Sequence, residues 1–198
     1  MRLVRPGPDR LPGYVAALER GWSPSSTRGR AQALEELARI ADDAPGFLAL
    51  MDDREALGPP VTLPDGSQHP RIPGLQRWIW DDAGDDGDDG DEPGFAGSIG
   101  LRWMKDGAPL PPHVLGHIGY SVVPWKRRRG LATQALARML PLARALGLRE
   151  VELTTDPDNR ASQRVITANG GVWVETFDKG AAYGHQPGLR WRIVLAAS

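Results

Sequence analysis

An α/β domain, with helices flanking one sheet, is the fold class that the sequence predicts. Short stretches rich in β-branched and aromatic residues alternate with stretches of helical periodicity, and proline or glycine separates them. The chain has 198 residues, enough for one domain with a hydrophobic core. We therefore expect residues 1–198 to form a single domain.

The first half of the chain predicts two helices and three strands. Leu34, Leu37 and Ile40 recur at three-residue spacing, which indicates a helix that ends before Pro45. Residues 58–74 hold five prolines without a clear period, so we expect a loop there. The strands are expected at 3–4, 75–82 and 95–103, and the helices at 9–20 and 25–43.

The second half predicts four strands and two helices. The strongest helix covers residues 131–146, where Leu131, Ala135 and Met139 begin an apolar stripe and Gly147 stops it. Pro141 should bend this helix, because proline cannot donate to the preceding turn. The remaining elements are strands at 115–123, 150–155, 172–177 and 189–195, a helix at 159–169 and a loop at 104–114.

The composition excludes several classes of protein. There is no cysteine, which rules out disulfides, thiolate metal sites and a cysteine-acyl intermediate. No apolar run approaches the ~18 residues of a membrane span, and residues 1–8 lack the apolar core of a signal peptide. We therefore expect a cytoplasmic protein that does not enter a membrane.

Charge is spread unevenly along the chain. Eight acidic residues lie between Asp81 and Glu92, and the rest of the chain has 24 basic residues against 17 acidic ones. The acidic run lacks the ligand order of an EF-hand loop, so we expect a solvated hairpin tip that could attract a cationic substrate. His69, His113 and His185 lie in loops without metal-ligand spacing, and no metal site is expected.

A basic, glycine-containing turn precedes the strongest helix, and we call its residues 127–132 the phosphate turn. A helix N-terminus offers unpaired N–H groups to an anion, and Gly130 lets the main chain approach phosphate oxygens. Residues 126–129, Lys-Arg-Arg-Arg, add positive charge. Basic clusters are often only solvated turns, and a nucleic-acid-binding module using this cluster is a competing interpretation.

The phosphate turn, Arg127-Arg128-Arg129-Gly130-Leu131-Ala132, resembles the Arg/Gln-x-x-Gly-x-Gly/Ala signature of the GCN5-related N-acetyltransferase (GNAT) superfamily. It follows a strand ending in Val122-Val123-Pro124, as in that family. A second block, with Asp158-Asn159-Arg-Ala-Ser162 and Asn169-Gly170-Gly171, is similar to a bacterial branch of acetyltransferases. The resemblance covers the chain from Trp78 onward and implies a mixed, mostly antiparallel sheet whose splayed central strands are flanked by helices.

The resemblance also implies where acetyl-CoA binds. The pantetheine arm would enter between the strand before the phosphate turn and the strand at 150–155, and would pair with the main chain of Val122 and Val123. Asn159 and Ser162 would hold the same arm, although Asn159 could equally be a plain helix cap. The residues implied for the pyrophosphate are Arg127, Arg128, Arg129, Gly130, Leu131, Ala132 and Thr133.

The catalytic groups are less determined. The reaction needs a base for an amine of pKa near ~10.4, and His117 or Glu152 is the candidate. Relatives often place a tyrosine after the Asn-x-x-Ala block as the acid, but the matching position is Ile166. Tyr120, Tyr183 or Ser162 could substitute, or water could.

The predicted function is direct transfer of an acetyl group from acetyl-CoA to a primary amine of a small molecule or peptide. The alternative is a catalytically silent module that senses CoA. We expect neither a nucleic-acid partner nor a membrane partner. The sequence does not identify the acceptor, and it leaves a homodimer open.

Overall fold

The computed structural model describes residues 1–82 and 94–195 of the chain. Contacts between residues divide the chain into two compact units, and each unit gathers three separate stretches of sequence. The first unit consists of Met1–Asp52, Leu75–Gly100 and Tyr120–Ala135, and the second of Asp53–Gly74, Leu101–Gly119 and Leu136–Ser198. That the whole chain acts as one domain stays a prediction.

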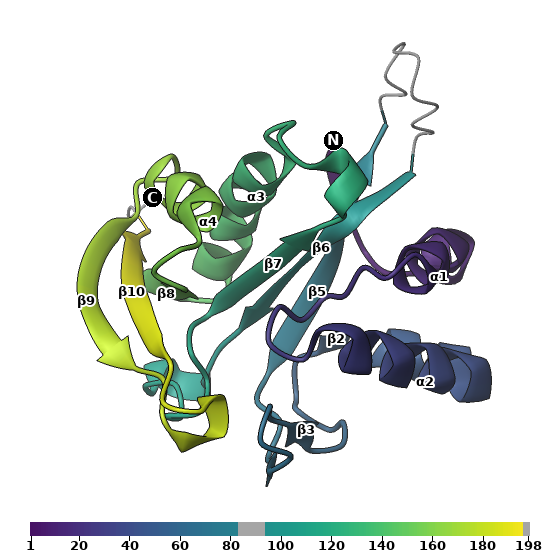
Figure 1. Cartoon of the computed structure of the whole chain (residues 1–198), viewed down its shortest axis with the longest axis horizontal. Helices are drawn as coiled ribbons and strands as arrows, with labels where there is room; N and C mark the ends of the chain where they lie inside the picture. The colour runs from purple at the N-terminus through teal and green to yellow at the C-terminus, as the bar shows by residue number, and fades with distance from the viewer. Residues whose placement is uncertain (83–93, 196–198) are drawn as a thin grey trace. The chain divides into compact units, whose positions relative to one another are not determined.

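The strands form three sheets, shown in Figure 1. The largest has the order β1-β5-β6-β7, with β2 also paired to β5, and the second has the order β8-β10-β9. β7 and β8 therefore each lie at the edge of a different sheet. The strands are β1 (Arg2–Val4), β2 (Asp52–Asp53), β3 (Val61–Thr62), β4 (Gln68–His69), β5 (Gly74–Asp81), β6 (Gly94–Arg102), β7 (Ile118–Val122), β8 (Glu150–Thr155), β9 (Val172–Asp178) and β10 (Pro187–Val194).

Four α-helices accompany the sheets in the described residues. They are α1 (Leu11–Glu19), α2 (Gly29–Ala49), α3 (Leu131–Ala145) and α4 (Arg160–Thr167). Short 3₁₀ helices lie at Pro8–Arg10, Lys105–Gly107, Pro124–Lys126 and Ala181–Tyr183. None of the helices in this part of the chain combines the length and the apolar character needed to cross a bilayer.

An aromatic cluster forms the core of the first unit. Tyr14 of α1 stacks on Trp78 of β5 with ring centroids 4.9 Å apart, and Trp22 and Phe95 meet Tyr14 edge to face. The Tyr14 hydroxyl donates to the buried carboxylate of Glu36. Burial raises the pKa of Glu36, and its bonds from Tyr14 and Gln32 oppose that shift.

Buried and partly exposed residues alternate along β8, so the second sheet has two different faces. Val151, Leu153 and Thr155 are buried, whereas Glu150, Glu152 and Thr154 lie on the opposite face. Antiparallel pairing with β10 opposes Arg192 to Glu152 and Trp191 to Leu153, so the two strands share this division. The second unit thus has one apolar and one charged sheet face.

The structure adds to one expectation about local elements and corrects two. The first part of α2 ends at Asp43 as expected, where φ and ψ are −147° and 82°, but a further helical stretch that continues to Ala49 was not expected. The expected loop at 58–74 contains the small β3–β4 hairpin. Leu34, expected on the apolar stripe of α2, is 53% exposed, and Leu37 and Ile40 pack against the core.

Most of the acidic run lies outside the described residues. Asp81 and Asp82 are described, and the other acidic residues of the run fall within 83–93. The expectation of a solvated hairpin tip there therefore stays a prediction.

A matched pair of leucines tests the core of the second unit. Leu136 of α3 is fully buried, whereas Leu57 is 87% exposed. We expect Leu136→Ala to lower the free energy of unfolding by about 3 kcal/mol, through lost burial and the cavity left behind. Leu57→Ala should leave it nearly unchanged. Denaturant unfolding of both variants checks this, and equal losses would contradict the assigned core.

Candidate active site

Two left-handed residues shape the phosphate turn. Arg128 has φ 64° and Gly130 has φ 71°. A Cβ on Gly130 would meet only Gln134 Nε2, at 3.8 Å, so the backbone conformation rather than space favours glycine there. The carbonyl of Gly130 accepts the N–H of Gln134 at 3.0 Å and begins α3. Leu131, Ala132 and Thr133 form the first turn of α3, and the N-terminus of a helix attracts anions.

The four basic side chains at 126–129 do not act alike. Arg127 and Arg128 are exposed, whereas Lys126 is only 3% exposed. The Lys126 ammonium lies 3.8 Å from a carboxylate oxygen of Asp81, and the half-buried Arg129 lies 3.0 Å from the same oxygen. Lys126 and Arg129 thus face Asp81, and the expectation that the basic residues add charge for phosphates stays a prediction.

Asp81 ends β5 and is itself buried. A buried carboxylate is tolerated when cations and hydrogen bonds compensate it, and Lys126 and Arg129 supply the cations. The ion pairs connect the end of β5 to the turn that follows β7. Asp81 therefore anchors the base of the phosphate turn.

The main-chain N–H and carbonyl of Val123 both form hydrogen bonds within the protein. Its N–H donates to Ala96 of β6 at 3.0 Å, and its carbonyl accepts from Lys126 at 3.1 Å. The Val122 carbonyl accepts from Arg127 Nε at 3.2 Å. Pairing of a pantetheine arm with free groups of Val123, which the resemblance implied, is therefore corrected, and Val122 remains as the candidate.

The chain just before β7 lies directly against β8. The His117 N–H donates to the Glu152 carbonyl at 2.7 Å, and the Thr154 hydroxyl donates to the Leu115 carbonyl. Gly116 makes this approach feasible, because a Cβ there would lie 2.8 Å from the Glu152 carbonyl oxygen. The backbone contact thus brings His117 and Glu152, expected from the sequence as alternative bases, to the same place.

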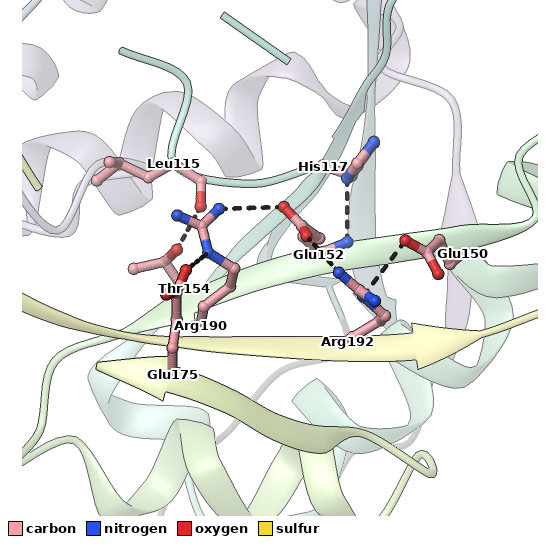
Figure 2. Close-up of polar contacts among 8 residues, drawn as sticks. All are labelled: Leu115, His117, Glu150, Glu152, Thr154, Glu175, Arg190 and Arg192. Carbon is pink, nitrogen blue, oxygen red and sulfur yellow. Dashed lines mark hydrogen bonds and ion pairs between the residues drawn. The ribbon is translucent and has the colours of Figure 1, made fainter. Parts of the chain in front are cut away.

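The hydrogen bond to His117 defines its tautomer. Nδ1 accepts the Glu152 N–H at 3.0 Å, so a neutral ring carries its proton on Nε2 (Figure 2). Burial lowers the pKa of His117, and the nearby Glu152 carboxylate only partly offsets this shift. The ring is therefore neutral near pH 7 and presents Nε2–H, a donor, rather than a free lone pair.

Both carboxylate oxygens of Glu152 bind guanidinium groups of β10 (Figure 2). Arg190 Nη1 lies 3.1 Å from Oε2, and Arg192 Nη2 lies 3.3 Å from Oε1. Arg190 also donates to Glu175 at 2.8 Å, and Arg192 lies 3.3 Å from Glu150. To take a proton, Glu152 would have to disturb an ion pair.

The remaining candidates lie on separate elements. Asn159 caps α4, since its Oδ1 accepts the Ser162 N–H at 3.0 Å. Ile166 is fully buried, while Tyr120 of β7 is half-buried. The Tyr183 hydroxyl donates to the His113 carbonyl at 2.9 Å, and burial raises its pKa. No contact in the described residues assigns any of them as the acid.

A cavity of about 1090 Å³ adjoins His117 and Glu152 within the second unit. Its other walls come from the loop before β7, from the turn before β8, and from Phe177 and Arg190. No group of three His, Cys, Asp or Glu side chains that could hold a metal occurs among the described residues.

Arg190, Arg192 and Asp81 were not identified from the sequence. Arginines alternate along β10 as glutamates alternate along β8, and this pattern of opposite charges was a usable signal for cross-strand pairing. Asp81 gave no such signal, because seven further acidic residues follow it in the same run.

Comparison with known proteins defines the class as acyltransferase. The sequence model of the acetyltransferase (GNAT) domain matches residues 34–172, so the chain belongs to the GNAT family. No curated protein gives a significant match.

Solved structures share the fold at low sequence identity. RimJ from Mycobacterium smegmatis, in complex with CoA-disulfide, has a TM-score of 0.55 at 16% identity, covering 94% of this chain and 78% of its own. The microcin C7 self-immunity acetyltransferase MccE, in complex with acetyl-CoA and AMP, has 0.54 at 10%, covering 97% and 91%. An acetyltransferase from Agrobacterium tumefaciens has 0.50 at 18%, covering 96% and 88%.

Asp81→Asn tests the anchor of the phosphate turn. The variant keeps the shape but removes the buried negative charge that Lys126 and Arg129 face, so we expect a loss of about 3 kcal/mol in the free energy of unfolding. Asp82→Asn is the matched control, because Asp82 pairs with the exposed Arg2 and should matter little. Urea unfolding compares them, and a stable Asp81→Asn variant would refute the anchor.

His117→Asn tests the neutral imidazole. Because burial lowers the pKa of His117, the stability that depends on the neutral ring is complete above about pH 6.5 and is lost as the pH falls toward the lowered pKa. Asparagine can accept the Glu152 N–H without titrating. We expect wild type to lose more unfolding free energy than His117→Asn between about pH 7.5 and pH 5. Parallel losses would exclude this role.

Proposed function

We propose that this chain is an acetyl-CoA-dependent N-acetyltransferase that transfers an acetyl group directly to a primary amine in a ternary complex. The phosphate turn carries the proposal: Gly130 is left-handed, the N-terminus of α3 follows, and Arg127 and Arg128 are exposed beside it. The CoA-disulfide of RimJ and the acetyl-CoA of MccE support the same donor here.

Acetyl-CoA binding would use the residues that the family resemblance implies. Main-chain N–H groups from Arg128 to Thr133 would bind the pyrophosphate, and the exposed arginines would add charge-assisted bonds. Val122 would pair with the pantetheine arm. Asn159, whose Oδ1 caps α4, keeps its amide N–H₂ as a donor for the same arm, with Ser162 beside it.

The transfer itself involves proton movement at the amine and at the leaving thiolate. The amine nitrogen attacks the thioester carbonyl carbon, the carbon–sulfur bond breaks, and the thiolate of CoA leaves. The amine loses a proton, and the thiolate gains one unless it is released charged. A thiol of pKa near ~8.5 is an undemanding leaving group, so positioning can supply much of the rate.

The polar contacts favour a donor role for His117. To act as a base, its ring would have to release the Glu152 N–H from Nδ1. With that bond kept, Nε2–H can hydrogen-bond the oxyanion of the tetrahedral intermediate. Glu152 would then position His117, while water collects the proton of the amine.

A catalytically silent CoA-binding module is the second candidate. It is favoured by the commitment of His117 and Glu152 to internal partners and by a buried Ile166 where relatives carry a tyrosine. Release of free thiol from acetyl-CoA in the presence of a panel of primary amines separates the two. CoA binding without release on any amine would establish the silent module.

Gly130→Trp tests the cofactor site. The indole would cover the approach to the turn, so we expect CoA affinity to fall more than a hundredfold in calorimetric titration. Gly66→Trp is the matched control, because Gly66 is also left-handed and its Cβ position is open. Circular dichroism checks that both variants fold, and unchanged CoA affinity in Gly130→Trp would refute the site.

A further inference from the structure

The cavity beside His117 is larger than a simple amine requires. Its volume of about 1090 Å³ lies just above the range of about 300–1,000 Å³ for clefts that hold drug-sized ligands. It opens next to the residues that start β7 and β8, where His117 and Glu152 lie. An acceptor that places its amine there would have room for a substantial body.

The walls of the cavity differ in chemistry. One wall is apolar and comes from the loop between β6 and β7, where Trp103, Met104, Leu110 and Val114 line it. Another part of the lining is the charged sheet face, which includes Glu150, Glu152 and Arg190. A ligand that matches both walls has a polar end and an apolar body.

Two of the cations that line the cavity are already paired with carboxylates. Arg190 binds the carboxylates of Glu152 and Glu175 and stacks over the Phe177 ring, 4.2 Å from its centroid. Lys105 is paired with Glu55 at 2.6 Å. These two cations are already matched by carboxylates, and Arg149, Glu150 and Glu152 also line the cavity, so its lining carries charges of both signs. The amine as the polar end of the ligand comes from the proposed acetyl transfer.

We propose that this cavity is the acceptor site and that the acceptor is an amphipathic small molecule, a primary amine on an extended apolar body. The amine lies at the His117 and Glu152 end, and the body packs against the apolar wall. This inference rests on the proposed acetyl transfer and specifies its substrate class.

A series of n-alkylamines from ethylamine to octylamine tests the class. Each methylene buried against the apolar wall should raise kcat/KM about fourfold, measured as thiol release from acetyl-CoA, until the cavity is filled. A kcat/KM independent of chain length would overturn the proposal. A peptide whose primary amine is acetylated faster than every alkylamine would overturn the small-molecule class.

Ala108→Trp tests the location. Ala108 is an exposed loop residue that lines the cavity, so tryptophan there should fill part of it. We expect kcat/KM to fall at least tenfold more for octylamine than for ethylamine. Equal losses for both amines would place the acceptor elsewhere.

Two further variants complete the test. Ala44→Trp makes the same change in an apolar groove of the first unit and should leave both amines unaffected. Leu110→Ala removes part of the apolar wall and should reduce the preference for octylamine, which keeps the test valid if Ala108→Trp does not fold. If the preference for octylamine is unchanged in Leu110→Ala, the acceptor body does not pack against the apolar wall.

The outcomes separate this inference from the proposed function. Absence of thiol release with every amine would contradict the proposed acetyltransferase function. Release that proceeds with all amines, but does not depend on chain length or on the cavity variants, would contradict only the proposed acceptor class.

Discussion

The close approach of the chain at Gly116 to the carbonyl of Glu152 is the constraint on which the candidate site depends. With no side chain at that position, the main chain before β7 lies against β8 and forms hydrogen bonds from His117 and to Leu115. The same contact delivers the Glu152 N–H to the imidazole. A larger residue at 116 would separate these groups and alter the wall of the cavity.

Charged side chains are arranged differently on the second sheet and in the phosphate turn. On the second sheet, guanidinium and carboxylate groups neutralise one another across β8, β10 and β9, so the face is polar without a strong net charge. In the phosphate turn, by contrast, Asp81 compensates the inner cations and leaves the outer arginines exposed. The first arrangement suits a neutral ligand surface, and the second suits a polyanion.

Much of the fold followed from local sequence patterns. β8 was predicted with its observed bounds, and α3 to within one residue, because alternation and helical periodicity are properties of neighbouring residues. The position of the phosphate turn was also predictable, since a strand, a basic turn and a helix follow one another in sequence. The continuation of α2 past Pro45 was missed, because a proline in the first turn of a restarted helix costs no hydrogen bond.

The chemistry of the site was less accessible to sequence. The tautomer of His117 depends on a backbone N–H 35 residues away, and periodicity does not report such a contact. Likewise, nothing local distinguishes Lys126 from Arg127, although one is buried against Asp81 and the other is exposed. Only the folded chain sorts neighbouring residues of like charge into different roles.

Arg128 adopts an unfavourable backbone conformation at a position where its side chain contributes positive charge to the turn. A non-glycine residue in the left-handed region costs on the order of 1 kcal/mol, and glycine would relieve that cost. The exposed guanidinium is thus carried by a residue whose backbone conformation costs energy. Binding of an anion to the turn would offset this cost, so the turn should be more stable with the anion bound than without it.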